Sequence, residues 1–105
     1  MAAIHLIENE GIMAKVGVHE YESGNWHVAV RTAQQLVGGD LYLHPAQDAP
    51  SSYGGTILSF RVMAADEVAP GRIVFRFRFS PPYRGVQSRG GWGQEKKYVG
   101  VADPE

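Results

Sequence analysis

The residues with the clearest chemical potential lie between Pro82 and Lys97, where basic and aromatic side chains alternate with four glycines. Guanidinium and ammonium groups pair with phosphates, and aromatic rings stack on unpaired bases. This composition is therefore typical of surfaces that bind single-stranded nucleic acid. A mobile glycine-rich hairpin on the surface has the same composition, so both interpretations stay open at this stage.

A second group of cations precedes this segment. From Arg72 to Phe79, aromatic or aliphatic residues alternate with residues that are mostly arginine, with a period of two, which predicts a strand with a phenylalanine face and an arginine face. The phenylalanine face is expected to be core. The arginine face is either a solvated face that prevents edge pairing or a surface that binds anions.

The hypothesis of a nucleic-acid interface assigns a role to each of these side chains. The bases are expected to stack on Trp92, Tyr83 and, as a third ring, Tyr53 from the loop at 45–55. The phosphates are expected to contact six cations, namely Arg76, Arg78, Arg84, Arg89, Lys96 and Lys97.

The net charge of −1 conceals an uneven distribution. Residues 1–71 carry three basic and eight acidic residues, a balance of −5, whereas residues 72–97 carry seven basic residues and one acidic residue, a balance of +6; Asp103 and Glu105 supply the remaining −2. A polyanion would neutralise the basic part. The acidic part of a second copy would do so equally well, which predicts salt-sensitive self-association as the alternative function.

Other chemistry finds little support in the residue pattern. The chain has no cysteine, which excludes disulfides, thiolate metal sites and a cysteine nucleophile. Its four histidines lack metal-ligand spacing, so we expect no metal and no cofactor. A small enzyme that uses the 45–55 loop with His44, Asp40 and Ser51 or Ser52 is the third hypothesis. No catalytic residue is assigned, and a non-catalytic protein is favoured.

These residues need elements that position them. A chain of 105 residues that is 44% hydrophobic is expected to form one domain, 1–105. The short apolar run 2–8 precedes strands that alternation predicts at 12–19, 26–30 (the third along the chain), 41–44, 56–62, 72–79 and 98–101, with a turn at 23–25. A short helix is predicted at 33–37, capped by Thr32 and ended by Gly38 and Gly39. The expected fold is mainly β (α+β by strict count), a small antiparallel β-barrel or pseudobarrel of about six strands with one short helix.

The order of features from Trp26 to Val62 resembles the PUA-like superfamily, its ASCH and EVE domains in particular. The resemblance consists of a strand led by Trp26, a short helix, Gly39 and Asp40 before an apolar strand, and a further strand that opens with Gly54 and Gly55. It implies a pseudobarrel with an aromatic cleft that binds RNA or a modified base. Carried over position by position, it places Trp26, Asp40, Tyr42 and Tyr53 at that pocket.

The cellular location is inferred by elimination. The first residues lack the positive region of a secretory signal, and no run approaches the roughly 18 apolar residues of a membrane-spanning helix. We therefore expect a cytoplasmic protein without a membrane partner.

Overall fold

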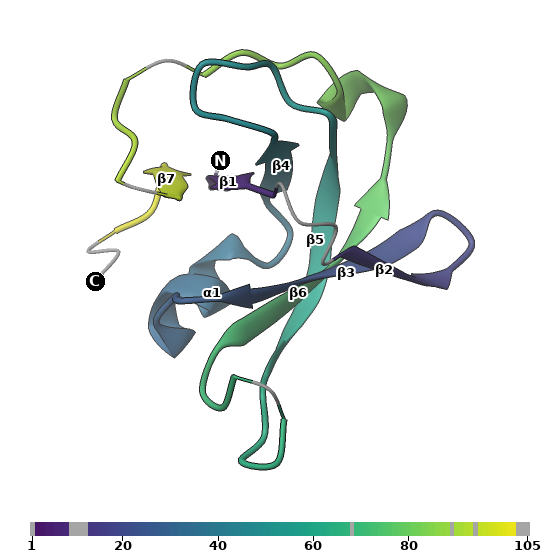
Figure 1. Cartoon of the computed structure of the whole chain (residues 1–105), viewed down its shortest axis with the longest axis vertical. Coiled ribbons are helices and arrows are strands. Elements are labelled where there is room, and N and C mark those ends of the chain that lie inside the picture. Colours follow the sequence, from purple (N-terminus) through teal and green to yellow (C-terminus); the bar gives the residue numbers. More distant parts are fainter. Residues whose placement is uncertain (1, 9–12, 68, 89, 94, 103–105) are drawn as a thin grey trace.

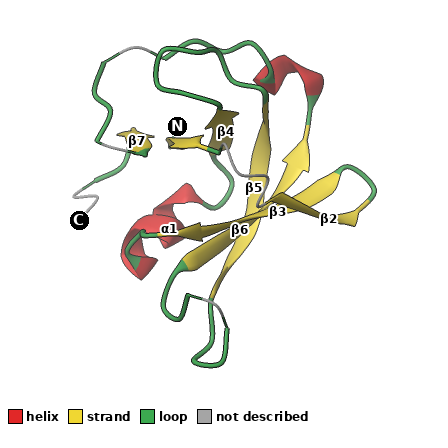
Figure 2. Cartoon of the chain, in the orientation of Figure 1, coloured by secondary structure: helices red, strands yellow, loops and turns green. Residues whose placement is uncertain are grey.

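The computed structural model describes residues 2–8, 13–67, 69–88, 90–93 and 95–102. Within these ranges the chain is mainly β, as predicted, with one α-helix (Figures 1 and 2). In chain order the elements are β1 (Ala3–Ile7), β2 (Met13–Gly17), β3 (Glu20–Trp26), α1 (Val30–Leu36), β4 (Asp40–His44), β5 (Tyr53–Val62), β6 (Ile73–Phe79), the 3₁₀ helix η1 (Pro81–Tyr83) and β7 (Lys96–Val99).

The seven strands form one sheet in the order β2-β3-β6-β5-β4-β1-β7. Neighbouring strands are antiparallel except β1 and β4, which are parallel, so the sheet is mixed rather than purely antiparallel as expected. A parallel pair needs a long crossover connection, and the chain between β1 and β4, which includes β2, β3 and α1, supplies it. Among the described residues, β2 and β7 are the two edges and do not pair with each other, so the sheet is open there.

The core lies on one face of this curved sheet, where α1 also packs. In β6 the alternation predicted a buried aromatic face, and Phe75 and Phe77 are indeed fully buried. Leu41 and Leu43 of β4 point to the same core, as expected. The buried hydrophobic cluster comprises Ile4, Leu6, Trp26, Val28, Ala33, Leu36, Leu41, Leu43, Ile57, Ile73, Phe75 and Phe77.

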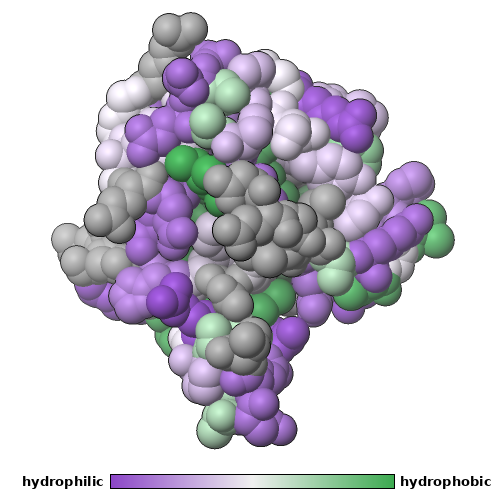
Figure 3. Space-filling view, in the orientation of Figure 1, coloured by the Kyte–Doolittle hydropathy of each residue, from purple (hydrophilic) through white to green (hydrophobic). Residues whose placement is uncertain are grey.

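The described surface in view in Figure 3 is largely hydrophilic. Figure 3 shows mostly hydrophilic residues on the face in view, with hydrophobic ones at the tip of the β2–β3 hairpin. That tip carries Val16, which is 39% exposed, and Val18, which is 80% exposed. The predicted strand at 12–19 therefore contains β2, but its valines do not contribute to the core.

The segment around Trp26 differs most from the sequence-based expectation. The strand predicted at 26–30 is wrong, because β3 ends at Trp26 and α1 begins at Val30. The predicted turn at 23–25 lies inside β3, where the pairing with β6 shifts register between Ser23 and Trp26. The glycine in this irregular stretch, Gly24, accommodates Val74, since a Cβ there would lie 2.8 Å from Val74 Cγ2.

The boundaries of α1 and β5 also differ. The helix begins after Ala29 rather than after Thr32, which lies buried within it, whereas Gly38 ends it with the expected positive φ of 86°. The loop predicted at 45–55 is shorter because β5 already begins at Tyr53. The last strand lies at Lys96–Val99 rather than at 98–101.

Candidate functional site

A row of polar and aromatic side chains crosses the sheet on the face opposite the core. The register places Tyr42 of β4, His5 of β1 and Lys97 of β7 side by side on adjacent strands. Their chain neighbours Ile4 and Leu41 are fully buried in the core. Because successive side chains of a strand point to opposite faces, the row must lie on the other side.

Two histidines on this face are joined by a hydrogen bond. His5 Nδ1 lies 2.9 Å from His44 Nε2, and His44 Nδ1 lies 2.9 Å from the carbonyl oxygen of Ala49. A carbonyl oxygen can only accept, so His44 Nδ1 must donate to it. In the neutral pair His44 Nε2 then accepts the hydrogen bond that His5 Nδ1 donates.

The pair is held in a poorly solvated environment. His5 is 6% exposed and His44 is fully buried. Burial, with smaller contributions from the neighbouring His44 and Lys97, lowers the pKa of His5 to about 4. His5 is therefore a neutral imidazole at neutral pH.

Aromatic rings enclose the two imidazoles. The Tyr42 ring stacks on His5 with 4.6 Å between ring centroids and an interplanar angle of 12°. Trp92 meets both imidazoles edge-on, at 6.1 Å from His5 and 5.3 Å from His44. The indole is anchored because its Nε1 donates a 2.8 Å hydrogen bond to the Ser88 carbonyl.

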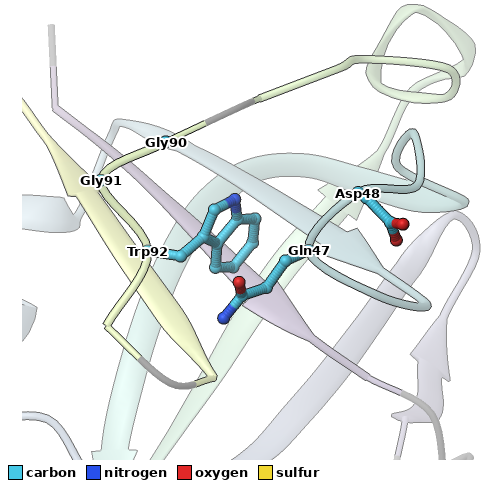
Figure 4. A pocket seen from close by; sticks show the side chains of 5 residues that line it. All are labelled: Gln47, Asp48, Gly90, Gly91 and Trp92. Atoms are coloured by element: carbon cyan, nitrogen blue, oxygen red, sulfur yellow. The ribbon is translucent and has the colours of Figure 1, made fainter.

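A pocket of about 410 Å³ opens beside this indole (Figure 4). In the figure the Trp92 ring lies between the Gly90–Gly91 backbone and the Gln47 side chain, while the Asp48 carboxylate points away from the ring. Gly90 and Gly91 have φ values of 74° and 73°, a conformation that favours glycine. The pocket is lined by Gln47, Asp48, Gly90, Gly91 and Trp92.

Lys97 lies immediately beside this pocket. A Cβ built on Gly91 would be 3.4 Å from Lys97 Cε, and the Lys97 ammonium donates a 2.6 Å hydrogen bond to Ser88 Oγ. The pocket therefore combines an aromatic wall, a neutral amide and a flanking cation.

Tyr83 fixes the loop that carries this pocket onto the sheet. Its hydroxyl donates a 2.6 Å hydrogen bond to Asp40 Oδ1, and its ring lies 5.2 Å from the Tyr42 ring. Burial and the hydrogen bond to Asp40 raise the pKa of Tyr83. Its Cβ lies close to Gly54, where an added Cβ would be 3.0 Å from Tyr83 Cβ. Tyr83, Asp40 and Tyr42, all predicted site residues, therefore lie together.

Two of the predicted phosphate contacts form ion pairs within the chain. Arg76 donates to Glu20 Oε1 from Nε at 2.9 Å and from Nη2 at 2.7 Å, and Arg78 Nη2 lies 3.5 Å from Glu20 Oε2. Arg61 likewise pairs with Glu22, at 3.5 Å. The pairing of β3 with β6 thus brings acidic and basic parts of the chain together. The uneven charge then no longer requires either a polyanion or a second copy to balance these arginines.

The remaining predicted phosphate contacts are dispersed. The Arg84 guanidinium lies over the rings of Tyr53 and Phe79, at 5.2 and 5.1 Å from their centroids. Lys96 Nζ donates to the backbone carbonyl of His27. Arg89 lies outside the described residues.

The two other rings predicted for the site are engaged elsewhere. Trp26 is 3% exposed and belongs to the core, with its Nε1 donating to Ser23 Oγ at 3.0 Å, so it does not line the pocket. Tyr53 packs against the core cluster. Burial and a hydrogen bond to Tyr21 raise the pKa of Tyr53 to about 12.

The arrangement gives no support to nucleophilic catalysis by the 45–55 loop. The Ser51 hydroxyl donates to the Tyr83 carbonyl at 2.5 Å and accepts from the Val86 amide at 2.9 Å, so its hydrogen bonds go to the backbone rather than to His44. Among the described residues, no group of three or more His, Cys, Asp or Glu side chains could hold a metal ion.

The histidine pair was not predicted from the sequence. Asp40, Tyr42 and His44 have a period of two opposite Leu41 and Leu43, which is a usable signal for a polar face on β4. No pattern near His5 in the sequence indicates that it reaches this face, because its partner His44 lies 39 residues further along the chain.

Comparisons with known proteins identify no relative: no family model matches the chain, and no curated protein or solved structure is significantly similar to it. In the part of the chain that the structure describes, none of the helices has the length and apolar character needed to cross a bilayer.

Proposed function

We propose that this protein binds single-stranded nucleic acid and holds one unpaired base against Trp92. The observation that carries the proposal is the pocket of about 410 Å³ that has the indole as its wall and the Lys97 ammonium beside it. Pockets for small ligands typically measure about 300–1,000 Å³, which is ample for one base.

The chemistry of the lining favours a nucleobase. Stacking of a base on an aromatic ring contributes about 1–3 kcal/mol and tolerates any base, because every base has a π-face. The Gln47 side chain, which lies next to the indole in Figure 4, is an amide, a group whose oxygen accepts and whose nitrogen donates hydrogen bonds of the kind that the edge of a base makes. Bases in a duplex are already paired and stacked, so the pocket suits a single strand.

The charge distribution favours a small electrostatic contribution. Lys97 flanks the pocket, whereas Lys96 pairs with the core residue Leu6 in the β1–β7 register and donates to the His27 carbonyl, and Arg76 and Arg78 are engaged with Glu20. One phosphate contact on a single strand predicts that log K falls with log salt with a slope of about −0.7. The proposed interface is therefore a base pocket with one cation at its border rather than an extended arginine surface.

The resemblance of residues 26–62 to the PUA-like superfamily supports the same ligand class. The pocket proposed here nevertheless uses Trp92 and Lys97, which lie outside the resembling segment.

The chain has two tryptophans, which makes a direct test simple. The variant Trp26→Phe leaves Trp92 as the sole indole fluorophore, and titration with short single-stranded RNA and DNA should quench its emission with a micromolar Kd that weakens as salt rises. In a wild-type background, Trp92→Ala should reduce the affinity for a labelled oligonucleotide at least about fivefold, the lower end of the range for one stacked base. Trp26→Phe should retain wild-type affinity and serves as the matched control. Absence of micromolar binding by both nucleic acids at low salt would refute the proposal.

A further inference from the structure

One imidazole nitrogen on the outer face of the sheet has no role in the contacts described so far. The chain of hydrogen bonds that starts at the Ala49 carbonyl uses both nitrogens of His44 and Nδ1 of His5. It assigns the proton of His5 to Nδ1 and leaves Nε2 with an unshared electron pair. The fold therefore fixes the tautomer of the His5 imidazole, and Nε2 is a hydrogen-bond acceptor.

This nitrogen is not completely enclosed. Among the described residues, no fully buried side-chain nitrogen or oxygen lacks a hydrogen-bond partner. The hydrogen bond of His5 is made through Nδ1, so the small exposed part of this side chain, 6% in all, includes Nε2. Access to Nε2 is therefore narrow and suits a single small donor such as a hydroxyl.

The groups around His5 define what such a ligand must carry. Lys97 lies directly opposite His5 in the β1–β7 register and places a cation beside it. The indole of Trp92, the wall of the proposed base pocket, lies 6.1 Å from the imidazole. Tyr42 and His44 occupy the β4 side of the ring. A matching ligand carries a hydroxyl donor next to an anionic group. The same sugar that bears this hydroxyl must also bear the base that stacks on Trp92.

A ribonucleotide has this combination, because the ribose 2′-hydroxyl lies between the base and the 3′-phosphate. Deoxyribose lacks the hydroxyl, and this group is the one by which proteins distinguish RNA from DNA at a given site. We propose that His5 Nε2 accepts a hydrogen bond from the 2′-hydroxyl of the nucleotide held at Trp92, with the adjacent phosphate at Lys97, and that the pocket therefore selects RNA over DNA. This inference rests on the proposed function and adds the residue that determines its specificity.

The deciding experiment uses the unaltered protein and three oligonucleotides of one sequence: RNA, DNA and 2′-O-methyl RNA. The methylated strand keeps the sugar conformation of RNA and removes the hydroxyl donor. RNA should bind about three- to tenfold more tightly than either of the others, the effect of one hydrogen bond. Equal binding of RNA and its 2′-O-methyl form would overturn the inference and leave the proposed function intact. Failure of all three to bind would refute both.

A variant pair assigns the effect to the imidazole. His5→Phe keeps a flat ring against Tyr42 and removes the acceptor, so the ratio of its RNA affinity to its DNA affinity should fall to about one, whatever the loss of the hydrogen bond to His44 does to both affinities. His27→Gln, at an exposed position, is the matched control and should keep the RNA preference. A His5→Phe protein that is folded by circular dichroism and still prefers RNA would overturn the assignment. The oligonucleotide comparison in the wild-type protein decides the matter if that variant does not fold.

Discussion

His5 and His44 form a direct imidazole–imidazole hydrogen bond, 2.9 Å long, between two parallel strands that are 39 residues apart in the chain. His5 is in register with Tyr42, so His44 is its diagonal neighbour on the same face of the sheet. This pair connects the N-terminal strand to the loop at Ala49 on one side and to Trp92 on the other. The Trp92 wall of the proposed pocket therefore packs against two buried imidazoles that are joined to each other.

The pH dependence of stability should reveal this pair. The pKa of His5 is about 4 in the folded chain and about 6.5 when unperturbed, so between these values the unfolded chain binds a proton that the folded chain does not. The unfolding free energy should accordingly fall as the pH drops from about 6.5 towards 4, by about 3 kcal/mol in total, and His5 should add no slope above pH 6.5. Urea denaturation across this range should show a flatter profile for His5→Gln than for wild type.

The control for this pH effect is His27→Gln, which should keep the wild-type slope because it leaves the His5–His44 pair intact. Proton NMR of the imidazole Cε1–H groups gives a second measurement. A titration midpoint of the His5 imidazole near pH 6.5 would contradict the lowered pKa of this side chain.

Removal of the Tyr83 hydroxyl should loosen the loop that carries the pocket. Tyr83→Phe loses the 2.6 Å hydrogen bond to Asp40 and leaves that carboxylate without this donor, so we expect a loss of about 1–2 kcal/mol in unfolding free energy. The matched change Tyr42→Phe keeps the Tyr83–Asp40 bond and should cost less. Equal losses in the two variants would show that the bond to Asp40 has no special weight.

The strand β6 was predictable because the pattern that indicates it lies entirely within its own residues. The alternation around Phe75 and Phe77 reports burial without reference to any other segment. The same kind of reasoning failed at Ser23, Gly24 and Asn25, where a local turn signal is overridden by pairing with β6. Propensity is a weak prior there, since cross-strand packing decides the outcome.

The candidate site was predictable in part for the same reason. Trp92 and Lys97 were identified from their types and spacing, which need no partner. The histidine pair and the ion pairs of Arg76 and Arg78 were not predicted in this way. They depend on which strands become neighbours, and for His5 that information lies 39 residues along the chain.

The close approach of β5 and β6 makes Gly55 a sensitive position. A Cβ on Gly55 would lie 1.8 Å from the Arg78 carbonyl oxygen, a contact that backbone atoms cannot relieve without breaking the pairing. Gly55→Ala should therefore cost more than about 3 kcal/mol or prevent folding. Gly71→Ala, with φ of 83° and open space around it, should cost only about 1–2 kcal/mol from backbone strain. Thermal denaturation of both variants makes the comparison, and similar melting temperatures would contradict it.

Arg84 should contribute to stability rather than to binding. Its guanidinium lies over the rings of Tyr53 and Phe79, and an exposed cation–π contact contributes about 0.5–1 kcal/mol. Arg84→Ala should lower the unfolding free energy by that amount and change oligonucleotide affinity less than about twofold, below one phosphate contact. A large loss of affinity in a stable variant would instead extend the interface to this end of the sheet.

Glu20 should weaken the binding of polyanions. Its carboxylate accepts two hydrogen bonds from Arg76 and lies 3.5 Å from Arg78, and the hydrogen bond from Arg76 contributes most to lowering the pKa of Glu20. Glu20→Gln should release both arginines, so oligonucleotide affinity should rise and the slope of log K against log salt should steepen by about 0.7 for each new phosphate contact.

The charge-matched control for Glu20→Gln is Asp66→Asn, which removes one negative charge at an exposed position on the connector between β5 and β6. If net charge alone governs binding, both variants should strengthen it equally. If the ion pairs restrain Arg76 and Arg78, Glu20→Gln should exceed Asp66→Asn in both affinity and salt slope. An unchanged slope in Glu20→Gln would show that the arginine face of β6 does not meet the ligand even when it is unpaired, and it would confine the interface to the border of the Trp92 pocket.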